Sequence, residues 1–483
     1  MKYRSLILFL ASALLSVSAF AQLSPKYPCS DHMVLQQQTS ALVWGHGNAG
    51  KTVKVTTSWD RRSYKTSVGE DGVWRVYVNT PAASYKHYEI NVKSGSEKYT
   101  ISDVLVGEVW IASGQSNMEM PLRGFNNCPT EGYMDVVSNP AGADEVRMLT
   151  VDINPSFEPL KDVEKTYGWR KAVPSEVSEM SATAYFFAEQ LNRTLNVPVG
   201  ILALPRGGAR VESWLPKATV EGYGTEDCSR EAVEKLNEYV RPYLMYNGME
   251  QPVKGYTARG FIWYQGCSNV GAHDVFVPRM TELVRQWRED WGVSADAMPF
   301  YQVEIAPYIY EGKDGESSAL LRAAQHKAAA TIPNSAIVCT NDLAYDYELT
   351  NIHPCQKRPV GQRLAYLALN RDYGFGNLPC YSPEAISVSA SEKDPSTLFV
   401  KCINCSCGTD RMRGIEGLEV AGEDGIFKPV DSVCMWQDNI LTVECKGIVN
   451  APKAIRYGWA NFRPGNLHNC YGLPFVPFNL SVE

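Results

Sequence analysis

The alternation of short apolar runs with amphipathic stretches, from Asp103 to about residue 373, constrains the fold of this chain most. The apolar runs have the length of strands and occupy residues 104–112, 199–204, 260–264, 300–305 and 335–340. The stretches between them have helical spacing or favourable helix composition, at residues 184–195, 277–291, 318–331 and 359–369. Such alternation predicts an α/β fold, a parallel sheet with helices on both faces.

The regions on either side of this alternation have a different pattern. Short apolar runs separated by glycine, proline and acid-glycine turns predict antiparallel β structure there. We therefore predict an N-terminal β-sandwich-like domain at residues 22–104, an α/β domain at 105–373 and a C-terminal β domain at 374–483.

The first 21 residues are typical of an export signal. Lys2 and Arg4 precede an apolar run, and Ala19-Phe20-Ala21 provides the small residues of a cleavage site. We expect cleavage after Ala21 and an exported protein, either periplasmic or extracellular. The apolar run is too short for a membrane span, and no later segment qualifies, so we expect no membrane insertion.

Composition narrows the range of partners. The formal net charge of −7 offers no basic surface for nucleic acid, so we expect no nucleic-acid partner.

The 13 cysteines are an odd number, so at least one is unpaired unless it bonds another molecule. Cys402, Cys405 and Cys407 lie close together without a second pair at zinc-ligand spacing, which favours disulfides or buried thiols. The pattern does not indicate an oligomeric state.

Polar or glycine-rich loops follow four of the five predicted strands, where ligands of α/β sheets bind. The first strand leads through Gly114-Gln115 to Ser116, a strand-turn-helix arrangement that exposes a serine. Ser116 is the candidate nucleophile and needs a base. His353, in the loop after the fifth strand, is the candidate base, and His273 is its one rival by position.

Hydrolysis of an ester also needs donors aimed at the oxyanion. The candidates are the backbone N–H of Ser116, that of Gly207 or Gly208 and a side-chain amide of Asn269 or Gln265. The residue that orients His353 stays open, because Thr350 occupies the position of the acid in an Asp-x-x-His arrangement. The remaining candidate acids lie at the end of the fifth predicted strand or in the loop after it: Asp342, Asp346 and Glu348. The alternative is that a backbone carbonyl orients His353, which would leave a Ser-His dyad.

Several blocks of this sequence resemble the sialate O-acetylesterases, a branch of the SGNH-type carbohydrate esterases. The blocks are GQSNMEMPL from Gly114, GGARVESW from Gly207, WYQGCSN within the segment from Tyr246, and NIHPCQKRPVGQRLAYLAL from Asn351. Further similarity begins at Asp31 and Ile455, so it spans nearly the whole mature chain in order.

The resemblance implies an SGNH-hydrolase-like parallel sheet flanked by β domains, and hydrolysis of acetyl esters on sialic acid or related sugars without metal or cofactor. It assigns Ser116 as nucleophile, His353 as base, and Gly208 and Asn269 as oxyanion positions. We place Gln115 and Gln265 in substrate binding. Arg206 and Arg210 flank the Gly-Gly turn, where a guanidinium suits the carboxylate of a sialic acid.

One position departs from the family. The third block usually reads WYQGESN, and this chain has Cys267 in place of the glutamate. Three outcomes of this substitution are open: the esterase activity is retained, the substrate preference changes, or the activity is lost. Cys267 itself is a less favoured nucleophile than Ser116, because Ser116 is intact and a cysteine must first be activated as a thiolate. Two alternatives therefore stand beside a sialate esterase: an acetyl esterase acting on xylan or another polysaccharide, and a catalytically impaired glycan-binding homologue.

Overall fold

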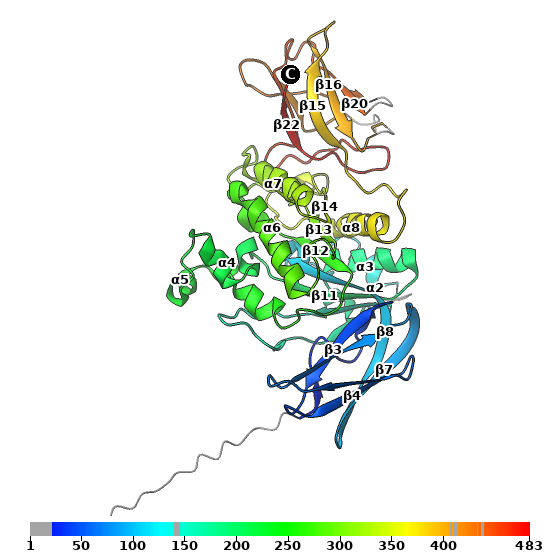
Figure 1. The fold of residues 1–483 in the computed structure, drawn as a ribbon. Helices are drawn as coiled ribbons and strands as arrows, with labels where there is room; N and C mark the ends of the chain where they lie inside the picture. The colour runs from blue at the N-terminus through cyan, green and yellow to red at the C-terminus, as the bar shows by residue number, and fades with distance from the viewer. Residues whose placement is uncertain (1–21, 140–144, 406–407, 410–413, 432, 436–438) are drawn as a thin grey trace, which may run out of the picture.

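The computed structural model describes residues 22–139, 145–405, 408–409, 414–431, 433–435 and 439–483, so the expected signal peptide at 1–21 lies outside the described residues. The chain is arranged in three tiers (Figure 1). The N-terminal strands lie at one end, the α/β region in the middle and the C-terminal strands at the other end.

The middle tier is built on a mostly parallel sheet. Its strand order is β10-β9-β11-β8-β12-β13-β14, and only β10 runs antiparallel to its neighbour. The strands are β8 (Glu97–Gly114), β9 (Val146–Thr150), β10 (Trp169–Lys171), β11 (Val199–Pro205), β12 (Gly260–Tyr264), β13 (Phe300–Val303) and β14 (Ser335–Val338). The predicted α/β class is confirmed.

Helices cover both faces of this sheet (Figure 1). α3 (Ala182–Leu195) packs with α8 (Lys357–Asp372) on one face, and α6 (His273–Asp290) packs with α7 (Ser317–Thr331) on the other. Because side chains of a strand alternate between faces, Trp110 and Ala112 of β8 belong to the first core, and Val109 and Ile111 to the second. Four shorter helices lie in the connecting loops: α1 (Ser116–Glu119), α2 (Tyr133–Val137), α4 (Lys217–Gly222) and α5 (Arg230–Lys235).

The N-terminal strands join the same sheet through β8, which is 18 residues long. β2 (Val34–Gln36) and β7 (Ser84–Ser94) pair with β8, and β4 (Thr52–Thr57) pairs with β7 and with β5 (Ser63–Ser67). β1 (Ser24–Pro25), β3 (Ser40–His46) and β6 (Val73–Asn79) form a separate sheet. The boundary that we placed between residues 104 and 105 therefore falls inside a continuous strand.

The C-terminal tier consists of two four-stranded antiparallel sheets. One contains β15 (Glu384–Ala390), β16 (Thr397–Ile403), β19 (Val433–Met435) and β20 (Ile440–Glu444); the other contains β17 (Leu418–Ala421), β18 (Lys428–Pro429), β21 (Ala454–Tyr457) and β22 (Phe478–Ser481). Cys402 and Cys405 are buried free thiols, and Cys470 is disulfide-bonded. Cys407 lies outside the described residues.

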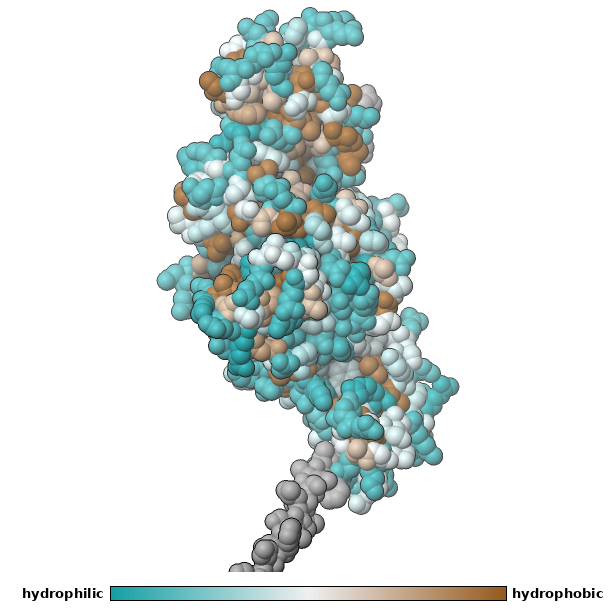
Figure 2. Space-filling view, turned by 60° about the vertical axis from the view of Figure 1, so that its left-hand side comes forward, coloured by the Kyte–Doolittle hydropathy of each residue, from teal (hydrophilic) through white to brown (hydrophobic). Residues whose placement is uncertain are grey.

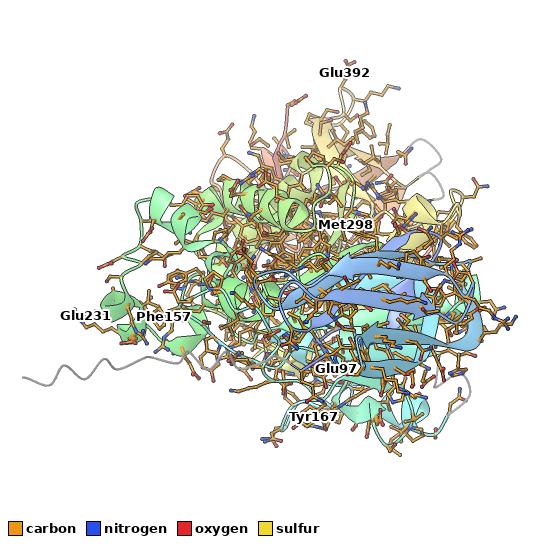
Figure 3. All side chains as sticks on the ribbon, turned by 60° about the horizontal axis from the view of Figure 1, so that its bottom comes forward. Glu97, Phe157, Tyr167, Glu231, Met298 and Glu392 are labelled. Atoms are coloured by element: carbon orange, nitrogen blue, oxygen red, sulfur yellow. The ribbon has the colours of Figure 1, made fainter. Side chains whose placement is uncertain are left out.

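The large hydrophobic clusters lie inside the molecule. Hydrophobic residues appear in small separate groups on the face in Figure 2. No helix within the described ranges is long and apolar enough to span a membrane. In Figure 3, the labels Phe157 and Glu231 mark the lobe that carries α5, where the Arg230 guanidinium lies 4.5 Å from the centre of the Phe157 ring.

Candidate active site

Three strand ends meet at one edge of the central sheet. Gly114 at the end of β8 pairs with Pro205 of β11 on one side and with Tyr264 of β12 on the other. Strands β11 and β9 lie on one side of β8 and strands β12 to β14 on the other, so this edge is the topological switch point, where α/β sheets bind ligands. The loops that follow these three strands carry Ser116, Gly208 and Asn269.

Gly114 permits the sharp turn that presents Ser116. Its φ is +133°, and a Cβ at this position would lie 2.2 Å from the carbonyl oxygen of Tyr264. No side chain fits there. The Gln115 N–H donates to the same carbonyl at 2.9 Å, and α1 begins at the next residue. The backbone therefore places Ser116 at the first position of a helix beside the strand edge.

Ser116 and His353 come together although 237 residues separate them. Ser116 Oγ lies 2.8 Å from His353 Nε2. Burial, together with the positive charge of Lys357, lowers the pKa of His353 from 6.5 to about 4. The imidazole is therefore neutral near pH 7, which is the form that accepts a proton from the serine.

No carboxylate in the described part of the chain forms an ion pair with His353. Asp342 binds Arg363 at 2.6 Å and His468 at 3.0 Å instead, and its side chain is 9% exposed. Glu348 accepts the backbone N–H groups of Tyr345 and Cys355. The geometry is that of a Ser-His dyad, one of the two arrangements left open by the sequence.

The loop that carries His353 is held by amide side chains. Asn351 accepts the His353 N–H at 3.0 Å and donates to the His353 carbonyl at 2.9 Å. Asn117, next to the nucleophile, donates to the Ile352 carbonyl at 3.0 Å and accepts from Lys357 Nζ at 2.6 Å. Lys357 is 1% exposed, and burial lowers its pKa to about 8. Asn117 and Lys357 were not among our predicted site residues.

Two backbone N–H groups are available for an oxyanion. The Ser116 N–H, in the first turn of α1, has no hydrogen-bond partner among the described residues, and neither has the Gly208 N–H. Gly208 has φ +71°, and a Cβ there would lie 2.6 Å from Cβ of Tyr239, so glycine is required. Both donors lie on loops that begin at adjacent strand ends.

Asn269, the third expected oxyanion position, has a fixed orientation. Its Oδ1 accepts from the Val211 N–H at 3.1 Å and from Gln265 Nε2 at 2.8 Å, and its Nδ2 donates to Glu212 at 3.1 Å. Arg279 pairs with the fully buried Glu212. Asn269 Nδ2 also lies 3.5 Å from the second carboxylate oxygen of Glu212, and this long contact is the one that an oxyanion would share or replace. Glu212 and Arg279 are supporting residues that sequence reasoning missed.

The four residues that we placed in substrate binding lie in different settings. Gln115 and Gln265 are buried and use their side-chain amides within the protein, on the Gly266 N–H and on the Ala209 carbonyl. Arg210 binds Glu226 at 2.6 Å and the Val240 carbonyl at 2.8 Å. Arg206 lies 4.7 Å from the centre of the Tyr239 ring, and its buried Nε has no partner among the described residues.

Cys267 interacts with Asn117 and Lys357, the two residues that hold the His353 loop, and is a protonated thiol at neutral pH. Burial raises its pKa, against the opposing effects of Tyr310 and Lys357. A protonated thiol is a poor nucleophile, so the geometry favours Ser116 in that role. The rival histidine, His273, begins α6 and contacts Asp274.

Comparison with known proteins agrees with this geometry. The chain is 27% identical to a sialate O-acetylesterase of Pongo abelii, over 93% of this chain and 91% of that protein, and 27% identical to the corresponding Mus musculus enzyme, over 94% and 93%. A crystal structure of a carbohydrate acetylesterase from Xanthomonas citri superposes with a TM-score of 0.81 at 29% identity, covering 95% of this chain and 99% of that one. Residues 106–370 match the family described as carbohydrate esterase, sialic acid-specific acetylesterase. With a serine and a neutral histidine in hydrogen-bond contact at the expected strand ends, the chain belongs to this family of carboxylic ester hydrolases.

Proposed function

We propose that the protein removes O-acetyl groups from sialic acids or related glycans through an acetyl-enzyme on Ser116. The contact of 2.8 Å between Ser116 Oγ and His353 Nε2 is the observation that carries this proposal. The same contact argues against a catalytically impaired glycan-binding homologue, because the nucleophile and the base lie within hydrogen-bond distance of each other.

The reaction follows from the geometry of the dyad. Ser116 Oγ attacks the acetyl carbon while His353 Nε2 takes the hydroxyl proton. The oxyanion accepts from the Ser116 and Gly208 N–H groups and from Asn269 Nδ2. His353 then gives the proton to the departing sugar oxygen, which leaves an acetyl ester on Ser116. Water attacks this ester, His353 takes its proton, and Ser116 regains a proton as acetate leaves.

Arg206 is the candidate for recognising a sialic acid carboxylate. It follows β11 at the active-site edge, its buried Nε lacks a partner among the described residues, and its Nη2 makes only a long contact of 3.7 Å with the exposed Glu238 carboxylate. Arg210 is less suited because Glu226 and a carbonyl already hold its guanidinium. If Arg206 has this role, Arg206→Ala raises KM for an acetylated sialoside more than for a neutral acetylated sugar.

A second candidate substrate is an acetylated polysaccharide such as xylan. Its support is the solved Xanthomonas citri relative, a carbohydrate acetylesterase, since acetylated polysaccharides belong to that substrate class. The chemistry at Ser116 would be the same, and the sugar bound beside it would differ.

One experiment tests the reaction and separates the two substrates. Acetate release is measured from O-acetyl sialic acid, acetylated xylan and a chromogenic acetate, for the wild type and for Ser116→Ala. We expect the variant to lose activity on every ester, and the wild type to prefer the sialic acid. Equal activity of Ser116→Ala and the wild type would refute the mechanism, whereas a preference for xylan would support the second substrate.

We also propose that the mature protein is exported to the periplasm or the medium. The charged start, apolar run and Ala-Phe-Ala ending of residues 1–21 support export, and so does the disulfide at Cys470, since disulfides persist in oxidising compartments. N-terminal sequencing of protein from fractionated cells is expected to begin at Gln22.

A further inference from the structure

The turn that follows β11 is fixed in a way that leaves one N–H group free. The Arg206 N–H donates to the Gly114 carbonyl at 3.1 Å, the Gly207 N–H donates to the Glu119 carboxylate, and the Ala209 N–H donates to the Arg206 carbonyl at 3.2 Å. Only the Gly208 N–H has no partner among the described residues. The one side-chain acceptor in this set belongs to Glu119.

Glu119 lies beside the nucleophile. It ends α1, the helix that Ser116 begins. A Cβ placed on Gly207 would lie 3.0 Å from Glu119 Oε2 and 3.5 Å from Ser116 Cβ, so the carboxylate and the nucleophile border the same small space. The turn and the nucleophile are therefore connected through one short helix.

We propose that Glu119 is a positioning residue that holds the Gly207-Gly208 turn with the Gly208 N–H directed at the oxyanion. This rests on the proposed attack by Ser116. Two consecutive glycines have wide conformational freedom, so a Gly-Gly turn without a tether samples orientations in which the Gly208 N–H points away. The Glu119 carboxylate fixes the first glycine, and Tyr239 packs against the second.

The useful property of Glu119 is its ability to accept a hydrogen bond, not its charge. A negative charge close to a developing oxyanion would oppose catalysis, and burial raises the pKa of Glu119, against the opposing effects of the Gly207 N–H and Arg206. A glutamine side chain has an acceptor oxygen at the same reach. Glu119→Gln is therefore expected to keep the turn in place, whereas Glu119→Ala releases it.

The test compares Glu119→Ala and Glu119→Gln on a chromogenic acetate. For Glu119→Ala we expect kcat to fall about 10- to 100-fold, less than the ~100- to 1000-fold loss typical of a deleted oxyanion donor, with KM within about 3-fold. A boronic acid, which forms a tetrahedral adduct with the serine, should bind more weakly by a similar factor. Glu119→Gln should keep kcat within about 3-fold of the wild type.

A matched control is Glu179→Ala. Glu179 lines a cavity of 250 Å³ together with Glu119, but its carboxylate binds Arg123 and does not contact the turn. Its kcat should equal that of the wild type. Should Glu119→Ala fail to fold, Glu119→Asp is measured, with an intermediate loss of kcat expected because the shorter side chain withdraws the acceptor.

Three results would overturn the role of Glu119: wild-type kcat in the alanine or aspartate variant, equal impairment by alanine and glutamine, or a change in KM alone. Ser116→Ala separates this failure from failure of the proposed function. If Ser116→Ala is inactive while Glu119→Ala is fully active, only the positioning role is wrong. If Ser116→Ala is active, the mechanism itself is wrong.

Discussion

His353 is held as a neutral base by two effects that disfavour its charged form, burial and the nearby Lys357 ammonium. A histidine with an ordinary pKa of 6.5 loses its function as a base below neutral pH, whereas a pKa of about 4 keeps the base available in mild acid. The imidazole therefore stays in its neutral, proton-accepting form at neutral and mildly acidic pH.

We expect the acid limb of the kcat/KM profile to have its midpoint near pH 4. The neutral imidazole is the active form, so activity is present above the lowered pKa of about 4 and is lost as the pH falls through it. The measurement is kcat/KM on a chromogenic acetate from pH 3.5 to pH 8, with circular dichroism to confirm that the protein stays folded. A midpoint at 6.5 or above would contradict the assigned environment of His353.

Compared with the glutamate that is usual in the family, Cys267 leaves one negative charge fewer near Lys357. A glutamate at this position would place a carboxylate beside the buried ammonium and weaken the effect that lowers the pKa of His353. We expect Cys267→Glu to move the acid limb to higher pH. Cys267→Gln has a similar size without the charge and should leave the limb in place. If both variants give the same profile, the charge at position 267 has no influence on the base.

At the scale of elements, α1 and the His353 loop are held together by Asn117. It donates to the Ile352 carbonyl and accepts from Lys357, so one side chain connects the helix of the nucleophile to the loop of the base. The distance between Oγ and Nε2 depends on this connection, and a serine nucleophile is sensitive to small displacements of its base.

We expect Asn117→Ala to lower kcat by about 10-fold, an order of magnitude in line with modest misplacement of a catalytic group. Asn117→Asp is the matched variant, because it can still accept from Lys357 but cannot donate to Ile352. Both variants should lose kcat, whereas the aspartate variant should be the more stable in urea denaturation. Wild-type kcat in Asn117→Asp would show that the bond to the Ile352 carbonyl does not position the base.

Local sequence patterns predicted most of the elements around the site. The runs at residues 260–264 and 199–204 correspond to β12 and β11 within one residue, because buried parallel strands form continuous apolar segments. β9 and β10 escaped prediction, and β10 has only three residues. Periodicity also did not reveal that β8 runs on through the predicted domain boundary, because a local window cannot show which strands pair.

The residues of the site also fall into two groups, those that the sequence pattern located and those that it missed. Ser116 and His353 follow strand ends, which a sequence pattern can locate, and the structure brings them together. The residues that support them were missed because their contacts join distant parts of the chain. Asn117 and Lys357 are 240 positions apart, and Asn269 and Glu212 are 57 apart. Nothing in either local sequence marks such a partner.

At the scale of the whole molecule, buried polar contacts join the C-terminal tier to the α/β tier. The Arg322 guanidinium donates to the carbonyls of Gly458 and Ala460, and His468 reaches Asp342, which also binds Arg363 of α8. Because these contacts lie between tiers, their loss is expected to affect stability more than chemistry.

Asp342→Asn tests this division between stability and catalysis. Arg363 and His468 lower the pKa of Asp342 from 3.8 to about 2 despite its burial. Its ion pairs therefore stabilise the folded protein above pH 3.8, and this contribution is lost as the pH falls toward 2. We expect the variant to lose about 2 kcal/mol of unfolding free energy at pH 7, with kcat within about 3-fold of the wild type. Urea denaturation at pH 7 and at pH 3 provides the measurement, and the difference from the wild type should shrink at the lower pH. A large loss of kcat with unchanged stability would instead identify Asp342 as the missing partner of His353.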